Sequence, residues 1–389
     1  MKILAIETSC DETAISILET RNTGKTANFT ILANNIHSQI EIHAQYGGVF
    51  PALAKREHLI NLPIIFEKTL KDAKIKIEKI DVIAVTTGPG LEPALWTGIV
   101  FARELSLKYK IPVVPVNHME GHIFSIFPKK AKTFKVDLNK KIFPILSLLV
   151  SGGHTELVLI KDWPKNGKLK YKKLGQTRDD AAGEAFDKVA RMLELPYPGG
   201  PEISRLAGIE RSSKLFKLSG PRTREDKGPD HENSNNLLPL SVTLPRPMIY
   251  TKDYDFSFSG LKTAVLYLLR DLKEKDSNIL QNDKIKQMIA REFEDAVVET
   301  LVHKTIKAIK QYKIKTLIVG GGVSANTYLQ ENIKKAVKKE KTKTEVHFPS
   351  KSLTGDNALM IGIAGYFGYK NKKIAKNLKS IKARGNLSL

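Results

Sequence analysis

Apolar residues gather in short runs along the chain, separated by polar turns and by longer amphipathic stretches. Residues 2–8 (KILAIET) and 14–18 (AISIL) flank the polar SCDET, which predicts a strand, a tight turn and a second strand. The same pattern returns at 145–160 (ILSLLVSGGHTELVLI), with two glycines in the turn. Two such units, each opening one half of the chain, predict a duplicated α/β architecture.

Further strands and helices are expected to alternate between and after these units. Residues 81–90 and 111–116 have the composition of buried strands, and Asn117 suits the N-cap of a helix that follows. Helices are predicted over 92–110, 179–193, 258–274, 283–312 and 355–369, a strand, glycine loop and helix over 315–337, and a strand over 345–350. This alternation favours mainly parallel sheets.

Composition narrows the class of protein. Among 389 residues, 63 Lys and Arg face 41 Asp and Glu, and the net charge of +22 either attracts polyanions such as RNA or reflects lysines spread over solvated faces. The single cysteine, Cys10, suits a reducing compartment, so we expect a cytoplasmic location. No apolar run approaches the roughly 18 residues of a spanning helix, so we expect no membrane association.

Two polar segments lack the periodicity of strands or helices. The lysine-rich 129–141 is predicted to be a solvated linker. Residues 220–247, rich in proline, asparagine and charge, are predicted to be a loop or insertion.

His118 and His122 are candidate metal ligands. Residues i and i+4 of a helix lie about 6 Å apart on one face, so both imidazoles can reach one divalent ion; two unrelated histidines remain the alternative. Glu120 is about 200° round the helix from each, unlike the base of an HExxH metalloprotease. Asp356, before the last predicted helix, is either a helix cap or the missing oxygen ligand.

Glycine turns and an acidic turn form the other candidate site. SGGHT (151–155), GPG (88–90) and VGGGVSAN (319–326) place backbone donors at strand ends, where a nucleotide can approach, although each alone is compatible with an ordinary turn. No GxxxxGK[ST] motif occurs, which excludes P-loop chemistry. Asp11 and Glu12 occupy the first turn, either as turn formers or as acidic groups at a cleft.

Together these motifs are similar to those of the tRNA-adenosine threonylcarbamoyltransferase family (TsaD type, formerly O-sialoglycoprotein endopeptidase). The residues within the motifs resemble those of bacterial members of the family. The matching segments run in order from residue 3 to about residue 365: IETSCDETAISI, HAQYGGVFPALAKREH, NHMEGH, LLVSGGHTELVL, DDAAGEAFDK, YPGGP, FSFSGLKTA, GGGVSAN and LTGDNALMIG.

The resemblance implies an α/β fold of the actin-like ATPase (ASKHA) class. Two lobes, each with a ribonuclease-H-like mixed sheet and flanking helices, would enclose a cleft. We expect an N-terminal lobe at 1–130 with the helix at about 356–370 packed back on it, a C-terminal lobe at 142–350 that contains the insertion, and a basic tail at 371–389.

The resemblance also implies an activity. The family transfers a threonylcarbamoyl group from threonylcarbamoyl-AMP to the N6 amine of the adenosine 3′ of the anticodon, in tRNAs that read codons beginning with A. ATP or AMP can occupy the donor's site. The implied partners are tRNA, an inactive actin-like paralogue that forms a heterodimer, and a small P-loop ATPase.

Residues carried over from the family complete the expected site. The implied metal ligands for one Fe²⁺ or Zn²⁺ per subunit are His118, His122 and Asp356. The implied substrate-binding residues are Leu149, Val150, Ser151, Gly152, Gly153, Asp187, Gly200 and Asn326. The implied catalytic residues are Asp11, Glu12 and His154, with one of the two acidic residues acting on the attacking amine.

The sequence departs from the family pattern at Glu92 and Pro93, and the basic tail runs past the matched region, where it could contact tRNA or be inert.

Three other functions compete with the transferase. A sugar or acetate kinase would share the fold without needing the paired histidines. A metalloendopeptidase is weakened by the position of Glu120. A non-enzymatic RNA-binding ATPase would not depend on His118.

Overall fold

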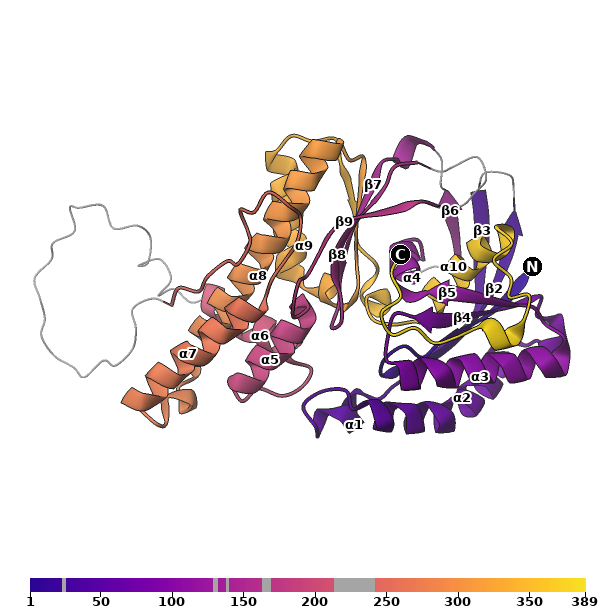
Figure 1. Cartoon of the computed structure of the whole chain (residues 1–389), viewed down its shortest axis with the longest axis horizontal. Coiled ribbons are helices and arrows are strands. Elements are labelled where there is room, and N and C mark those ends of the chain that lie inside the picture. The colour runs from indigo at the N-terminus through magenta and orange to yellow at the C-terminus, as the bar shows by residue number, and fades with distance from the viewer. Residues whose placement is uncertain (23–25, 129–131, 138–139, 163–168, 213–241) are drawn as a thin grey trace, which may run out of the picture.

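The computed structural model describes residues 1–22, 26–128, 132–137, 140–162, 169–212 and 242–389 (Figure 1). The strands are β1 Lys2–Glu7, β2 Glu12–Asn22, β3 Thr26–Ser38, β4 Val82–Gly88, β5 Val113–Asn117, β6 Thr133–Asp137, β7 Ile145–Val150, β8 Thr155–Ile160, β9 Tyr171–Gln176, β10 Thr316–Gly320 and β11 Glu345–His347. The α-helices are α1 Ile40–Ala44, α2 Pro51–Ala73, α3 Glu92–Tyr109, α4 His118–Phe124, α5 Ala182–Met192, α6 Gly199–Ser212, α7 Ser259–Lys275, α8 Asp283–Tyr312, α9 Thr327–Lys339 and α10 Ala358–Lys370.

The strands form two sheets with the same core topology. The first has the order β5-β4-β1-β2-β3-β6 and the second β11-β10-β7-β8-β9, so each opens with an antiparallel meander and continues with parallel strands beside its first strand. The predicted duplication is confirmed. The prediction of mainly parallel sheets is wrong, because the strands joined by short turns pair antiparallel and both sheets are mixed.

The two opening hairpins place their turns at equivalent positions. β1 pairs with β2 up to Glu7 opposite Ala14, and β7 pairs with β8 up to Val150 opposite Thr155. All six residues of β7 and all six of β8 are buried, as expected for strands covered on both faces. Each turn therefore projects from the end of a rigid strand pair.

Helices cover both faces of the first sheet. α2 and α3 pack on one face, around Ile6, Ile15 and Ile83, and α10 packs on the other. α10 is apolar on nearly all sides and approaches the strands closely: a Cβ on Gly365 would lie 2.3 Å from that of Ala84. The last long helix is thus part of the same layer structure as the first strands (Figure 1).

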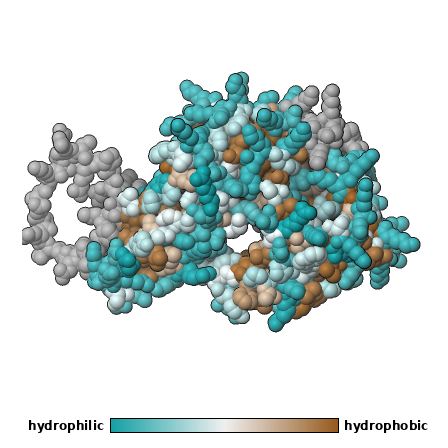
Figure 2. Space-filling view, viewed as in Figure 1, coloured by the Kyte–Doolittle hydropathy of each residue, from teal (hydrophilic) through white to brown (hydrophobic). Residues whose placement is uncertain are grey.

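The second sheet packs against α5 to α9, with Phe186, Phe258 and Phe293 in its core. The short helix α4 lies where the two sheets meet, and its Met119 and Ile123 pack against Leu149 and Ile318 of the second sheet. The two lobes therefore share a core at α4. Figure 2 shows the surface hollowed between the part that contains α5 and the part that contains α1.

The sequence predicts a linker at 129–141 and a loop or insertion at 220–247. The linker prediction for 129–141 is wrong at its centre, because β6 pairs with β3 at the edge of the first sheet and buries Phe134 and Val136. Most of the predicted insertion 220–247 lies outside the described residues. Across the described ranges, no helix is long and apolar enough to cross a membrane.

The C-terminal segment runs along the first lobe. The Arg384 N–H donates to the Thr87 carbonyl at 2.9 Å, and the Gly90 N–H donates to the Gly385 carbonyl at 3.1 Å. The Gly385 N–H also donates to Oε1 of Glu92 at 3.1 Å. Glu92, one of the two departures from the family pattern, is therefore a partner of this segment.

Candidate active site

Helix α4 presents its two histidines on one face because its start is fixed by Asn117. The Asn117 carboxamide accepts hydrogen bonds from the Met119 and Glu120 N–H groups at 2.8 and 3.3 Å, which confirms the predicted N-cap. The helix begins directly at His118, and His122 follows one turn later. The ring centroids of the two histidines lie 4.6 Å apart.

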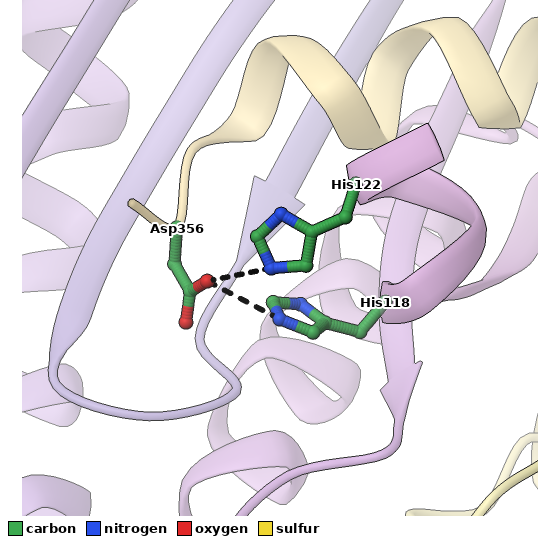
Figure 3. Close-up of side chains that lie close together, drawn as sticks. All are labelled: His118, His122 and Asp356. Carbon is green, nitrogen blue, oxygen red and sulfur yellow. Dashed lines mark ion pairs between the residues drawn. The ribbon is translucent and has the colours of Figure 1, made fainter. Parts of the chain in front are cut away.

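Asp356 completes a cluster of three potential metal ligands. Its Oδ1 lies 3.2 Å from Nε2 of His118 and 3.3 Å from Nε2 of His122, and Figure 3 shows the three side chains converging from α4 and from the segment before α10. The alternative role of Asp356 as a helix cap is wrong, because Asn357 caps α10 and accepts from the Met360 N–H. The carboxylate is therefore free to face the imidazoles.

The three residues fit a divalent transition metal. One ligand atom from each lies within 4.8 Å of the others, and imidazole with carboxylate is a donor set suited to iron or zinc. Both ring nitrogens of His122 are buried without a hydrogen-bond partner among the described residues, since Asp356 approaches Nε2 without hydrogen-bond geometry. An orphaned imidazole in the interior is costly unless something else binds it.

Two residues absent from the sequence-based site support His118 from behind. Oε2 of Glu7 lies 3.0 Å from Nδ1 of His118, and Ser9 Oγ lies 3.2 Å from the same nitrogen. Glu7 is completely buried. A carboxylate behind a metal-ligating histidine orients the ring and fixes its tautomer, and this arrangement leaves Nε2 for the ion.

Electrostatics in the cluster follow from this proximity. Burial opposes protonation of His118, but the carboxylates of Asp356 and Glu7 outweigh burial and raise its pKa well above the usual range. Burial likewise opposes ionisation of Asp356, and the two histidines overcome it, so the pKa of Asp356 is well below its usual range. The cluster thus holds positive charge against an ionised carboxylate, and a metal ion takes the place of the protons when it binds.

Glu120 points away from the cluster, as the helical geometry predicts. It accepts a hydrogen bond from the Tyr171 hydroxyl at 2.7 Å and lies 3.6 Å from the Lys373 ammonium. Both of its partners lie outside the metal cluster. The general base of an HExxH metalloprotease therefore has no counterpart in α4.

The acidic turn lies at the end of β1, beside the metal cluster. Ser9 in this turn donates to Oδ2 of Asp356 at 3.4 Å, so the turn touches the cluster directly. Asp11 is buried and Glu12 half-buried. Burial and the neighbouring carboxylates of Asp11 and Asp356 raise the pKa of Glu12 well above its usual range. Burial also raises the pKa of the Cys10 thiol well above its usual range, so Cys10 is a poor nucleophile.

The equivalent turn in the second sheet offers open backbone. Gly152 and Gly153 are exposed, and a Cβ added to either would meet nothing within 4 Å. The turn is held by the Ser151 N–H, which donates to the His154 carbonyl at 2.8 Å. Burial, followed by the charges of His118 and His122, lowers the pKa of His154 to about 4. His154 is therefore neutral near pH 7.

The remaining predicted substrate residues occupy three different settings. Leu149 and Val150 are buried in β7 with their side chains in the core, so a ligand could reach only their backbone. Asp187 on α5 accepts a hydrogen bond from the Gly199 N–H at 2.8 Å, next to Gly200 at the start of α6.

Asn326 is held by a buried carboxylate that sequence reasoning did not find. Its Nδ2 donates to Oε1 of Glu294 at 2.7 Å and to Ser204 Oγ at 3.0 Å, while its Oδ1 accepts from the Leu329 N–H and caps α9. Glu294 is completely buried and also pairs with Arg211. No local sequence signal marks Glu294, because it lies in the middle of the 30-residue helix α8.

Comparison with known proteins identifies the family. The profile described as tRNA N6-adenosine threonylcarbamoyltransferase (TsaD) matches residues 30–363. The chain belongs to this threonylcarbamoyltransferase family. The protein so named from Thermosipho africanus is 44% identical over 370 residues, which cover 95% of each chain. The protein so named from Staphylococcus epidermidis is 41% identical over 368 residues, which cover 95% of this chain and 92% of that protein.

Membership of the threonylcarbamoyltransferase family establishes the class of reaction. The chain is a transferase that modifies the N6 position of tRNA adenosine with a threonylcarbamoyl group, which decides against the kinase and the non-enzymatic RNA-binding alternatives. Among solved structures, HypF from T. kodakarensis superposes with a TM-score of 0.52 at 12% identity and covers 97% of this chain and 48% of that chain. The expected actin-like ATPase fold is confirmed.

Proposed function

We propose that the donor is threonylcarbamoyl-AMP and that it lies against the turn between β7 and β8. The observation that best supports this donor site is the open backbone at Gly152 and Gly153, which has no side chain to exclude a ligand and lies at the end of a strand. Backbone N–H groups in such turns suit phosphate oxygens. Asp187, Gly200 and Asn326 on α5, α6 and the start of α9 would hold the ribose and adenine.

His118, His122 and Asp356 would hold one Fe²⁺ or Zn²⁺ ion per subunit. When bound, the ion supplies positive charge that stabilises negative charge developing on the donor. Glu7 and Ser9 keep the His118 ring in its orientation through Nδ1. His154, neutral near pH 7, can offer a hydrogen bond without adding charge next to the cluster.

Asp11 and Glu12 would handle the proton of the attacking amine. The adenosine N6 attacks the carbonyl carbon of the donor, the bond from that carbon to the phosphate oxygen breaks, and AMP leaves with the electron pair. The proton lost by N6 passes to a carboxylate of the acidic turn. Because its pKa is raised, the Glu12 carboxylate is a stronger proton acceptor than an exposed carboxylate.

The acceptor would be the adenosine 3′ of the anticodon in tRNAs that read codons beginning with A, bound in the cytoplasm with the help of partner proteins. The paralogue surface would lie on α2 and the loop before it, where Figure 2 shows apolar residues at the lower edge of the molecule. Phe50 before α2 and Ile60 and Ile64 one turn apart on it are 54%, 52% and 61% exposed, and several large apolar side chains exposed on one element favour an interaction surface. A small P-loop ATPase would join this heterodimer.

Single-turnover transfer of radiolabelled threonylcarbamoyl from the donor to unmodified tRNA tests the proposal. The reaction should contain this protein and its partner subunits, with two tRNAs that differ only in the base 3′ of the anticodon. Label on the tRNA with adenosine and none on the tRNA with guanosine is the expected result. Equal labelling of both tRNAs, or labelling of neither by a folded and metal-loaded assembly, would overturn the proposal.

A further inference from the structure

A continuous chain of hydrogen bonds runs through the interior of the first lobe. The Phe50 N–H donates to Nδ1 of His43 at 3.3 Å, and Nε2 of His43 lies 3.1 Å from Oε1 of Gln39. Nε2 of Gln39 lies 3.3 Å from Nδ1 of His58, and Nε2 of His58 lies 2.9 Å from the Cys10 carbonyl. Gln39, His43 and His58 are completely buried. We call these three residues the relay.

The direction of every hydrogen bond in the relay is fixed by its two ends. The Phe50 N–H can only donate, and the Cys10 carbonyl can only accept, so Nε2 of His58 must carry a proton. A neutral imidazole supplies one donor and one acceptor, and the carboxamide of Gln39 supplies one of each to its two neighbours. The bonds therefore all point from Phe50 toward Cys10.

Two further contacts strengthen the end at Cys10. The Thr13 hydroxyl lies 2.7 Å from Nδ1 of His58 and shares the lone pair of this nitrogen with the Gln39 amide, and the Gln39 backbone N–H donates to the Asp11 carbonyl at 3.0 Å. Burial lowers the pKa of both His43 and His58, which keeps each ring singly protonated as the relay requires. The segment from Cys10 to Thr13 is thus attached to the relay at three points, the carbonyls of Cys10 and Asp11 and the Thr13 hydroxyl.

The other end of the relay meets the second lobe. The loop at residues 45–50, between α1 and α2, presents the Gly47 carbonyl to the Arg191 guanidinium of α5, which donates a hydrogen bond to it. Gly47 adopts φ +64, a conformation in which a side chain would be strained. Arg191 lies one turn after Asp187 on the same helix.

We propose that Gln39, His43 and His58 are positioning residues that hold the loop carrying Asp11 and Glu12 in a fixed relation to helix α5. This inference rests on the proposed function, in which α5 contacts the donor and the acidic turn acts on the N6 amine of the adenosine. The relay touches neither substrate. Its role is to set the distance between helix α5, which contacts the donor, and the acidic turn, which acts on the amine.

Substitution of His58 tests the proposal. His58→Phe keeps a planar ring at this position and removes all three hydrogen bonds of the imidazole, whereas His58→Gln places an amide N–H where Nε2 donates to Cys10. We expect His58→Phe to slow single-turnover transfer at saturating donor by at least about tenfold, with the donor Kd changed less than about twofold. His58→Gln should recover most of the rate. Gln39→Leu, which interrupts the relay elsewhere, should behave like His58→Phe.

Thr69→Val is the matched control on the same helix. The Thr69 hydroxyl is buried and bonded to the Ile65 carbonyl, far along α2 from Cys10. This variant should lose thermal stability and keep its transfer rate. A normal rate in folded His58→Phe and Gln39→Leu would overturn the proposal, as would losses of rate that merely follow losses of stability in all three variants.

Hydrogen exchange separates this proposal from the proposed function. Amides of residues 8–13 should exchange at least about tenfold faster in His58→Phe than in the wild-type protein, while Thr69→Val leaves them unchanged. This readout needs no donor and no tRNA. Wild-type protein that fails to transfer would overturn the proposed function alone, whereas unchanged exchange at 8–13 in both relay variants would overturn the relay.

Discussion

Glu7 and His118 make a buried contact between the first strand and helix α4, with Oε2 of Glu7 3.0 Å from Nδ1 of His118. The same carboxylate accepts from the Ser9 N–H at 2.6 Å and from the Thr86 hydroxyl at 2.7 Å. Three donors thus converge on one carboxylate that is completely buried. The orientation of His118 is therefore set by the sheet beneath it as well as by helix α4.

Glu7→Gln should weaken metal binding without unfolding the protein. An amide cannot satisfy all the donors that converge on the carboxylate and raises the basicity of the imidazole less, so we expect affinity for Zn²⁺ to fall by about 10- to 100-fold. Competition with a chromophoric chelator measures this. Glu19→Gln on the neighbouring strand, where Glu19 pairs with Lys2 near the surface, is the control and should bind Zn²⁺ like the wild type. Equal affinity in Glu7→Gln would contradict the role of Glu7.

Ile60→Glu should disrupt the proposed heterodimer. Ile60 and Ile64 lie one turn apart on α2 and are more than half exposed, so a charge there would be buried on association. Loss of about 2–4 kcal/mol of binding free energy is expected if the residue lies at the centre of the interface. Isothermal titration with the paralogue measures the Kd. Leu266→Glu, on α7 and 48% exposed, should leave the Kd unchanged, and a normal Kd for Ile60→Glu would place the interface elsewhere.

His154 should make the metal-free protein sensitive to acid. Its pKa falls from 6.5 to about 4 on folding, so between these values the unfolded chain binds a proton that the folded chain does not. The free energy of unfolding must therefore decrease as pH falls through this window, by at most about 2 kcal/mol between pH 7 and pH 5 from this residue.

Urea unfolding at pH 7 and pH 5 measures the His154 contribution. His154→Gln should lose less stability than the wild type over this interval, because glutamine does not titrate. The same loss in both proteins would mean that His154 is exposed enough to keep its ordinary pKa. Both proteins must be treated with a chelator first, since a bound ion changes the charge beside the ring.

Deletion of residues 384–389 should destabilise the first lobe. Backbone hydrogen bonds from this segment reach Thr87 and Gly90, and Asn117, the cap of α4, donates to the Ser388 carbonyl at 3.2 Å. We expect Tm to fall by several degrees, at about 2–4 °C for each kcal/mol lost. Lys376→Ala removes an exposed charge of the same tail and should leave Tm unchanged. Weaker tRNA binding with an unchanged Tm after the deletion would instead favour a tRNA-contacting tail.

The sequence predicted those parts of the site that depend on local geometry. The spacing of His118 and His122, with Asn117 before them, determines a capped helix with both imidazoles on one face, and the structure contains it. The two hairpins could also be predicted from the sequence, because each consists of two short apolar runs separated by a polar turn. Each of these features involves residues within one or two turns of chain.

Features that depend on the packing of distant segments could not be predicted. Glu7 meets His118 only because β1 and β5 flank β4, so that sequence positions 111 apart become neighbours. β6 has a period-two pattern, with Phe134 and Val136 buried. Its five residues lie in a lysine-rich stretch of sequence, and they pair with the distant strand β3 at the edge of the sheet. The relay likewise joins residues of α1 and α2 to the turn after β1, which is distant from them in sequence.

Single-turnover transfer from radiolabelled threonylcarbamoyl-AMP to tRNA, with wild type and His118→Ala compared in the same partner complex, measures whether transfer depends on the cluster of His118, His122 and Asp356. His347→Ala is the control, since the side chain of His347 is 43% exposed on β11. We expect wild type and His347→Ala to label the adenosine 3′ of the anticodon, and His118→Ala, folded but unable to retain metal, not to label it. Undiminished labelling by folded His118→Ala would contradict this expectation.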